Sequence, residues 1–304
     1  MEITEQIGRL KQQRGALILA HYYVPEEIQQ IADFVGDSYF LSKKAMEAPQ
    51  KTIVFCGVQF MGESAKLMSP DKTILLPDAA ADCPMAHMAT PQEVARVRAE
   101  HPDAAVVCYI NSTAELKSCC DVCVTSSNAV KIVRALPQNE IFFIPDSNLA
   151  HYIAQQVPEK TFVFGTGYCH VHHSITEQMV RQARREHPQA LFVAHPECRG
   201  DVLALADAVG STSEIIDFAT QNPAQEFIVG TEMGVLYELQ KRNPDKRFYP
   251  VHAHQVCPNM KRNSLEKVRD ALENMQPAVE LPGQWSRRAL APLEQMHTLA
   301  EAAR

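Results

Sequence analysis

The stretch Ala16-Leu17-Ile18-Leu19-Ala20-His21 occurs in three related versions along this chain of 304 residues. The other two are residues 104–109 and 190–195, and each version opens with an alanine, continues with apolar residues and ends on a polar side chain. Because self-similar copies within one chain act as a small internal alignment, positions that agree across them are either scaffold or parts of a shared site. The polar residues that end the three stretches mark one such position.

Further features recur at fixed distances from these stretches. A threonine followed by acidic or amide residues opens each copy as a helix start, at Thr4, Thr90 and Thr176, so the repeat period is 86 residues. A hydroxyl stands 17 residues after each polar end, at Ser38, Ser126 and Thr212. Each copy closes on a single cysteine, at Cys83, Cys169 or Cys257. We therefore expect three domains: residues 1–86 together with 260–304, residues 87–172, and residues 173–259.

The apolar runs indicate the type of sheet. Short continuous runs such as Ile53-Val54-Phe55, Phe142-Phe143-Ile144 and Phe227-Ile228-Val229 are separated by helical stretches. Continuous rather than alternating apolar runs are typical of parallel strands covered on both faces. The sequence therefore predicts an α/β protein of three pseudo-symmetric α/β/α layered domains, in which helix and strand alternate around small parallel sheets. A further capped helix is expected from Ser264, packed on the first domain.

The aligned polar residues are expected at one end of each sheet. Ligands of parallel α/β sheets bind beyond the carboxyl ends of the strands. The polar ends of the three stretches follow the first strand of each copy, the hydroxyls follow the second strand, and the cysteines follow the last. Three domains arranged around a pseudo-threefold axis would bring these edges to one central pocket.

Composition and charge exclude several classes of protein. With 46% hydrophobic and 21% charged residues the chain has the composition of a soluble globular protein, and no apolar run approaches the roughly 20 residues of a membrane helix. The acidic N-terminus is not followed by a hydrophobic stretch, so we expect a cytoplasmic protein. A net charge of −7 without a basic run argues against binding to nucleic acid or to acidic membranes. The sequence has no glycine-rich nucleotide-binding loop and no serine-nucleophile motif.

The three closing cysteines are candidate metal ligands. One thiolate from each domain would supply three ligands, whereas a closed structural zinc site has four. A four-iron four-sulfur cluster held by three cysteines keeps one iron free to bind substrate oxygen or nitrogen. The alternative is that all three are buried apolar cysteines, which are common. The near-copies Cys83-Pro84-Met85 and Cys257-Pro258-Asn259-Met260, and the loop-like sequence around Cys169, favour the ligand interpretation.

The remaining cysteines and histidines carry weaker signals. Cys120-Asp121-Val122-Cys123 has the spacing of a redox or zinc motif, but the repeat aligns it with Ala32-Asp33-Phe34-Val35 and Ala206-Asp207-Ala208-Val209. Its thiols therefore replace small core residues. His172 lies shortly after Cys169 and is a site candidate, whereas His252 and His254 are interpreted as ordinary loop residues.

Taken with their spacing, these motifs resemble the quinolinate synthase A family of bacterial NAD biosynthesis. The matching stretches include Cys83-Pro84-Met85-Ala86 and Gly230-Thr231-Glu232-Met233-Gly234, together with residues 20–23, 31–38, 109–115, 125–130, 169–172, 195–198, 210–212 and 257–261. Two features depart from the family pattern. His21-Tyr22-Tyr23 stands where the family often has His-Asn-Tyr. Asn259 and Met260 stand where longer members have a further CxxC, so no such thiol switch is expected.

The resemblance implies a transferase that condenses iminoaspartate with dihydroxyacetone phosphate to quinolinate, releasing phosphate and two waters. It implies one 4Fe-4S cluster per chain at the centre of the three domains, held by Cys83, Cys169 and Cys257, with one iron lacking a protein ligand. The implied catalytic residues are Tyr23, Tyr109, His195 and Glu197. The implied substrate-binding residues are His21, Ser38, Tyr109, Asn111, Ser126, His172, His195, Glu197 and Thr212. An aspartate oxidase or dehydrogenase is the expected source of the unstable iminoaspartate.

Two other functions remain open at this point. Another hydro-lyase with an open iron would dehydrate one hydroxy acid and would not need a triose phosphate. A non-enzymatic iron–sulfur sensor would need a partner surface such as a basic patch for nucleic acid, and none is visible in the sequence.

Overall fold

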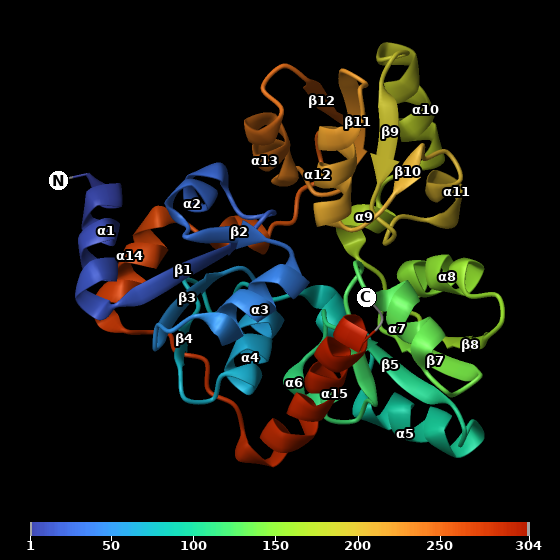
Figure 1. Cartoon of the computed structure of the whole chain (residues 1–304), viewed down its shortest axis with the longest axis horizontal. Helices are drawn as coiled ribbons and strands as arrows, with labels where there is room; N and C mark the ends of the chain where they lie inside the picture. The colour runs from blue at the N-terminus through green and yellow to red at the C-terminus, as the bar shows by residue number, and fades with distance from the viewer. Residues whose placement is uncertain (1, 303–304) are drawn as a thin grey trace.

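The computed structural model describes residues 2–302 and contains three sheets of four parallel strands each. The sheets, each packed with its own helices, surround the centre of the molecule (Figure 1). Helix and strand alternate through each repeat in the order that the apolar runs predicted. The predicted fold class, three α/β/α layered domains with small parallel sheets, is confirmed.

The elements divide evenly among the repeats. The first repeat contains α1 (Ile3–Arg14), β1 (Ala16–His21), α2 (Glu26–Ile31), β2 (Phe34–Gly36), α3 (Ser38–Glu47), β3 (Thr52–Cys56), α4 (Gln59–Met68) and β4 (Thr73–Leu75). After η1 (Pro84–His87), the second contains α5 (Pro91–Glu100), β5 (Ala105–Tyr109), α6 (Ala114–Lys117), β6 (Val122–Val124), α7 (Ala129–Ala135), β7 (Glu140–Ile144), α8 (Ser147–Gln156) and β8 (Thr161–Phe164). After α9 (His170–His173), the third contains α10 (Glu177–Glu186), β9 (Leu191–Ala194), α11 (Gly200–Leu203), β10 (Ala208–Val209), α12 (Thr212–Gln221), β11 (Glu226–Gly230), α13 (Val235–Arg242) and β12 (Arg247–Pro250). The chain then continues through η2 (Met260–Arg262), α14 (Leu265–Asn274) and α15 (Gly283–Ala302). None of these described helices has the length and apolarity needed to cross a bilayer.

All three sheets have the same strand order. The first strand of each repeat lies between the second and the third, and the fourth is at the edge, as in β2-β1-β3-β4, β6-β5-β7-β8 and β10-β9-β11-β12. The strands within each sheet pair in parallel. The carboxyl ends of a sheet's strands therefore meet at one edge, where ligands of such sheets bind.

One polar interaction is repeated in all three domains and explains part of the self-similarity. An aspartate before the second strand accepts a backbone N–H from the first strand at 2.7–2.8 Å, in the pairs Asp33–Ile18, Asp121–Val106 and Asp207–Phe192. The same carboxylates pair with basic residues of the opening helices, namely Lys11, Arg98 and Arg184. Because it ties the opening helix and the second strand to the central strand, this aspartate is scaffold.

The cysteine pair with redox-motif spacing flanks one of these aspartates. Cys123 is fully buried in β6, where it is the register partner of Cys108 in β5. Cys120 is half-buried, and its Sγ donates to the carbonyl of Leu116 at 3.2 Å. The interpretation of Cys123 as a core residue is therefore confirmed.

The hydrophobic core is shared between the first and second repeats, whereas the third repeat has clusters of its own. Helix α14 begins after Ser264, whose Oγ accepts the N–H of Lys267, and it packs against α1 and β3. Helix α15 contacts α4 of the first repeat and α6, β6 and α7 of the second (Figure 1). Because α15 joins two repeats, the assignment of residues 260–304 to the first domain stays a prediction.

Candidate functional site

A cavity of about 700 Å³, counting its mouth, lies where the three repeats meet. Its wall includes every residue proposed for the site from the sequence: His21, Tyr23, Ser38, Cys83, Tyr109, Asn111, Ser126, Cys169, His172, His195, Glu197, Thr212 and Cys257. These residues come from all three repeats, and most of them follow strand ends or stand near helix starts. The structure thus brings the proposed residues together, while their individual roles stay predictions.

Two histidines at equivalent positions, one ending β1 and one following β9, are oriented in the same way. The N–H of Tyr23 donates to Nδ1 of His21 at 3.2 Å, and the N–H of Glu197 donates to Nδ1 of His195 at 3.3 Å. Burial is the main cause that lowers the pKa of both rings to about 3, so both are neutral. Because Nδ1 accepts a hydrogen bond, the hydrogen of each ring is on Nε2. Nε2 of His195 lies 3.3 Å from Oγ of Ser126.

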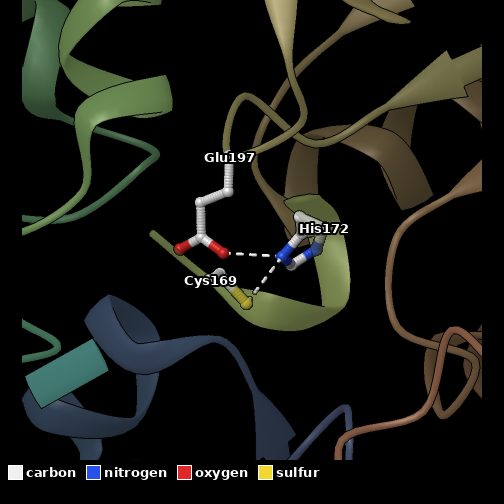
Figure 2. A group of neighbouring side chains, drawn as sticks. All are labelled: Cys169, His172 and Glu197. Atoms are coloured by element: carbon white, nitrogen blue, oxygen red, sulfur yellow. Dashed lines mark hydrogen bonds and ion pairs between the residues drawn. The ribbon is translucent and has the colours of Figure 1, made fainter. Parts of the chain in front are cut away.

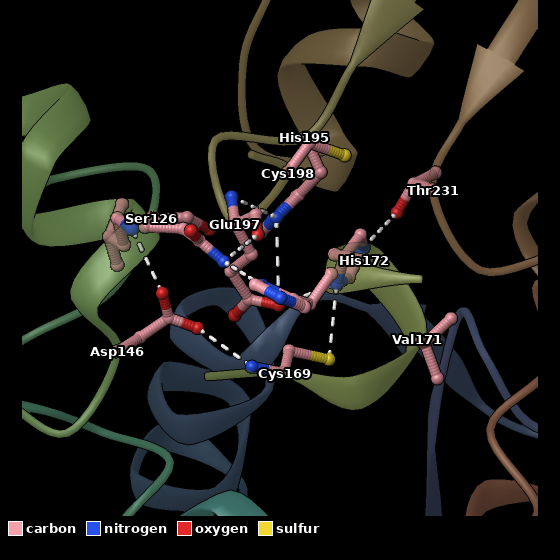
Figure 3. Close-up of polar contacts among 12 residues, drawn as sticks. Ser126, Asp146, Cys169, Val171, His172, His195, Glu197, Cys198 and Thr231 are labelled. Atoms are coloured by element: carbon pink, nitrogen blue, oxygen red, sulfur yellow. Dashed lines mark hydrogen bonds and ion pairs between the residues drawn. The ribbon is translucent and has the colours of Figure 1, made fainter. Parts of the chain in front are cut away.

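Glu197 is a buried carboxylate at the centre of the polar contacts (Figure 3). Its Oε2 lies 2.6 Å from Nδ1 of His172 and 3.8 Å from Nδ1 of His195. Burial opposes its ionisation, but the His172 imidazole at 2.6 Å and the hydrogen bond from Tyr109 outweigh burial and lower the pKa of Glu197 to about 2. Glu197 is therefore an anion although only 3% of its surface is exposed.

Hydrogen bonds through Thr231 and His172 connect the Tyr23 hydroxyl to this carboxylate. The Tyr23 hydroxyl is 2.7 Å from Oγ1 of Thr212 and 2.8 Å from Oγ1 of Thr231. Thr231 Oγ1 is in turn 2.8 Å from Nε2 of His172. Burial, followed by the charge of Glu197, raises the pKa of Tyr23 and Tyr109 well above the usual value, so both phenols keep their protons. The cavity wall thus combines the ionised Glu197 with Tyr23 and Tyr109, whose phenols keep their protons and can donate them.

Helix N-termini also reach the cavity wall. Ser38 and Thr212 are the first residues of α3 and α12, and the capping bonds of these helices are made by Asp37 and Ser211 instead. The partial positive charge of a helix N-terminus attracts anions. No lysine or arginine is among the described residues that line the cavity. Hydroxyls, neutral imidazoles and helix ends are therefore the groups available to bind an anion.

The three closing cysteines reach the cavity from one loop of each repeat. Cys83, Cys169 and Cys257 stand just before η1, α9 and η2, and burial raises the pKa of each thiol. The thiols of Cys83 and Cys257, and of Cys169 and Cys83, are near enough to disfavour each other's ionisation. Their sulfurs do not all lie within 4.8 Å of one another, and within residues 2–302 only Cys169, His172 and Glu197 form so compact a group (Figure 2).

Comparison with known proteins assigns the chain to a family. The family described as Quinolinate synthetase A protein matches residues 5–298, which include all three repeats. The chain belongs to the quinolinate synthetase A family. A relative named quinolinate synthase from Caldicellulosiruptor saccharolyticus is 54% identical over 271 residues, which is 89% of each chain. Relatives with the same name include the protein of Clostridioides difficile, 46% identical over 300 residues and 99% of each chain. Another is that of Thermodesulfovibrio yellowstonii, 47% identical over 296 residues, 97% of this chain and 98% of its own. The family resemblance, and with it the prediction of an enzyme, is confirmed.

The repeat pattern did not identify several residues of this quinolinate synthetase A site. Thr231 connects Tyr23 with His172, and two buried carboxylates hold cysteine loops. Asp146 accepts the N–H of Cys169 at 3.1 Å, and Glu232 accepts the N–H of Cys257 at 3.0 Å. A signal was present, because these polar residues directly follow the apolar strands β7 and β11, at the same sheet edge as the aligned residues.

The depressed pKa values of His21 and His195 predict that the stability of this protein falls in mild acid. Because the folded rings resist protonation down to about pH 3, the unfolded chain binds more protons as the pH falls below about 6.5. At pH 5 the free energy of unfolding should be lower by about 2 kcal/mol for each ring than at a pH above 6.5. Glu197 acts in the same direction at lower pH, since its stabilising charge is lost as the pH falls from about 4.5 towards 2.

Urea unfolding of metal-free protein at pH 5, 6 and 7 measures this dependence. The His195→Gln variant should lose less stability than the wild type between pH 7 and pH 5, by about 2 kcal/mol, whatever its stability at pH 7. An equal loss in both proteins would show that His195 is not held neutral.

Proposed function

We propose that this chain is a transferase of de novo NAD biosynthesis that condenses iminoaspartate with dihydroxyacetone phosphate to quinolinate, releasing phosphate and two waters. The curated relatives are named quinolinate synthase. The observation that best supports the proposal is the cavity, in which an ionised Glu197, two protonated phenols and one cysteine from each repeat face the same space. An aspartate oxidase or dehydrogenase in the same compartment, the cytoplasm, would supply the unstable imine.

The donor set fits a 4Fe-4S cluster better than a single ion. In a tetrahedral site with metal–sulfur bonds of about 2.3 Å, the sulfurs lie about 3.8 Å apart. The sulfurs of Cys83, Cys169 and Cys257 are spread more widely than this, yet they share one cavity. In a cluster each sulfur binds a different iron, which requires such a spread. These three residues would hold the cluster, whose fourth iron would serve as a Lewis acid for substrate oxygen or nitrogen.

The side chains of the cavity can carry out the proton transfers that the condensation needs. Glu197 is ionised and buried, so it can take a proton from a carbon next to a carbonyl or imine group. Tyr109 and Tyr23 keep their protons and can donate them to the groups that leave as water. The Tyr23–Thr231–His172 hydrogen bonds lead to Glu197, so a proton can be passed between donor and base. His195, stacked on His172, donates through Nε2.

The same wall is suited to two anionic substrates. The Ser38 and Thr212 hydroxyls stand at helix N-termini, and Ser126 precedes α7. With the Nε2 hydrogens of His21 and His195, they would bind the carboxylates and the phosphate. The Asn111 side-chain oxygen is buried without a hydrogen-bond partner. Because an unpaired buried polar atom is costly, this oxygen would orient a substrate donor.

The reaction is tested by purifying the protein without oxygen and supplying freshly generated iminoaspartate and dihydroxyacetone phosphate. Quinolinate should form only when both substrates and the loaded protein are present. A cluster-loaded protein that forms no quinolinate, but dehydrates a single hydroxy acid, would instead be another hydro-lyase with an open iron.

Replacement of the proposed base should stop turnover without loss of the cluster. The Glu197→Gln variant keeps the size of the side chain but cannot accept the proton, so its rate should fall about 10²- to 10⁴-fold at unchanged iron content. Glu238→Gln is a matched control, because Glu238 is buried and paired with Arg242 outside the cavity. A Glu197→Gln rate close to that of Glu238→Gln would disprove the role of Glu197.

Replacement of a proposed ligand should remove iron. The Cys83→Ser variant should contain substantially less iron per chain than the wild type after anaerobic reconstitution, because serine is a poorer ligand for iron in such clusters. Cys119→Ser is the control, since Cys119 is half-buried and lies outside the cavity wall. Iron analysis and the visible spectrum measure the outcome, and full loading of Cys83→Ser would refute its assignment.

A further inference from the structure

Cys169, His172 and Glu197 form a compact group of three different donors (Figure 2). One ligand atom from each residue lies within 4.8 Å of the other two, and no other such group exists within residues 2–302. His172 and Glu197 are buried, and Cys169 is half-buried at the cavity wall. Sulfur, imidazole nitrogen and carboxylate oxygen together are the donors that borderline divalent ions such as Zn²⁺ and Co²⁺ bind.

Two of the three donor–donor distances are slightly shorter than those of a tetrahedral site, and the third pair of donors lies within 4.8 Å. Nδ1 of His172 lies 2.6 Å from Oε2 of Glu197 and 3.2 Å from Sγ of Cys169. Metal–ligand bonds of about 2.0–2.3 Å place tetrahedral donors about 3.3–3.7 Å apart. An ion would therefore take the place of the hydrogen between His172 and Glu197, and the donors would move apart by less than about 1 Å.

Each of the three donors is also supported from outside the group, and Figure 3 shows the contacts of Thr231 with His172 and of Asp146 with the Cys169 loop. Thr231 Oγ1 lies 2.8 Å from Nε2 of His172, where it can accept the ring hydrogen when Nδ1 is a ligand. Tyr109 hydrogen-bonds Glu197. Asp146 accepts the N–H of Cys169 at 3.1 Å and so positions its loop. Such hydrogen-bond partners orient the ligands of metal sites and increase the affinity of the site for its ion.

We propose that the cluster-free protein binds one borderline divalent ion through Sγ of Cys169, Nδ1 of His172 and Oε2 of Glu197. The fourth coordination position faces the cavity and holds water, as in sites with three protein ligands. On binding, the Cys169 thiol loses its proton to solvent, and the His172 hydrogen moves from Nδ1 to Nε2, facing Thr231. If Cys169 is a cluster ligand, as the proposed function requires, ion and cluster exclude each other. Zinc would then hold the protein in a form that cannot be loaded with iron.

Cobalt titration of the protein, freed of iron by anaerobic chelation, tests the site. Co²⁺ should bind one equivalent per chain, with a sulfur-to-cobalt charge-transfer band and the intense visible bands of four-coordinate cobalt, and Zn²⁺ should displace it. The Cys169→Ser variant should lose the charge-transfer band, and His172→Gln should bind Co²⁺ at least tenfold more weakly. The Cys83→Ser and Cys257→Ser variants are matched controls that remove the other cavity thiols, and both should bind like the wild type.

Two results would overturn this proposal. If His172→Gln binds as tightly as the wild type, the imidazole is not a ligand. If Cys83→Ser or Cys257→Ser loses the band as completely as Cys169→Ser, the ion is bound by several cavity thiols. The proposed site of Cys169, His172 and Glu197 is then wrong. Melting curves of all four variants establish that each is folded before titration. Because the titration uses cluster-free protein and no substrate, its outcome is independent of whether quinolinate is formed.

Discussion

The charge of Glu197 inside the protein is the constraint on which the rest of the site depends. A buried carboxylate is strongly disfavoured unless nearby groups compensate its charge. Here the compensation comes from His172 after β8 and Tyr109 at the end of β5. Tyr109 belongs to the second repeat and His172 to the segment that closes it, whereas Glu197 belongs to the third. The ionised state of Glu197 therefore requires that the second and third repeats be docked against each other.

The cavity wall that is proposed to bind anions contains no lysine or arginine among the described residues. Neutral imidazoles, hydroxyls and helix N-termini hold an anion by directed hydrogen bonds and partial charges, and among the described wall residues no lysine or arginine competes with that anion for the Glu197 carboxylate. The nearby Lys261 is instead paired with the buried Glu232 and with the backbone of Tyr23. Binding of this kind depends on the geometry of the hydrogen bonds, which suits the two anionic substrates of the proposed function.

Some features are present in all three repeats, whereas other aligned positions carry different residues. Each domain must fold its own sheet, so the contact of the second-strand aspartate with the central strand is present three times, as in Asp33, Asp121 and Asp207. The cavity, in contrast, is shared by all three domains, so a position that faces it need not carry the same group in each repeat. The position that ends the central strand is accordingly a histidine in two repeats and Tyr109 in the other. A repeated residue is thus scaffold where it serves its own sheet, as the three aspartates do, whereas the repeated cysteines and hydroxyls line the shared cavity.

Periodicity, helix caps and internal repetition were enough to predict the order of elements, the parallel sheets and the sheet edge at which the repeated hydroxyls and cysteines lie, because these depend on short segments of chain. The expected roles of Tyr23, Asn111 and Glu197 came from the resemblance to the family. The sequence patterns could not predict that Glu197 contacts His172, that Thr231 connects His172 to Tyr23, or that α15 packs between two repeats. Those contacts join segments far apart in the sequence. The protonation state of each group follows from such distances and from burial, which arise only when the domains dock.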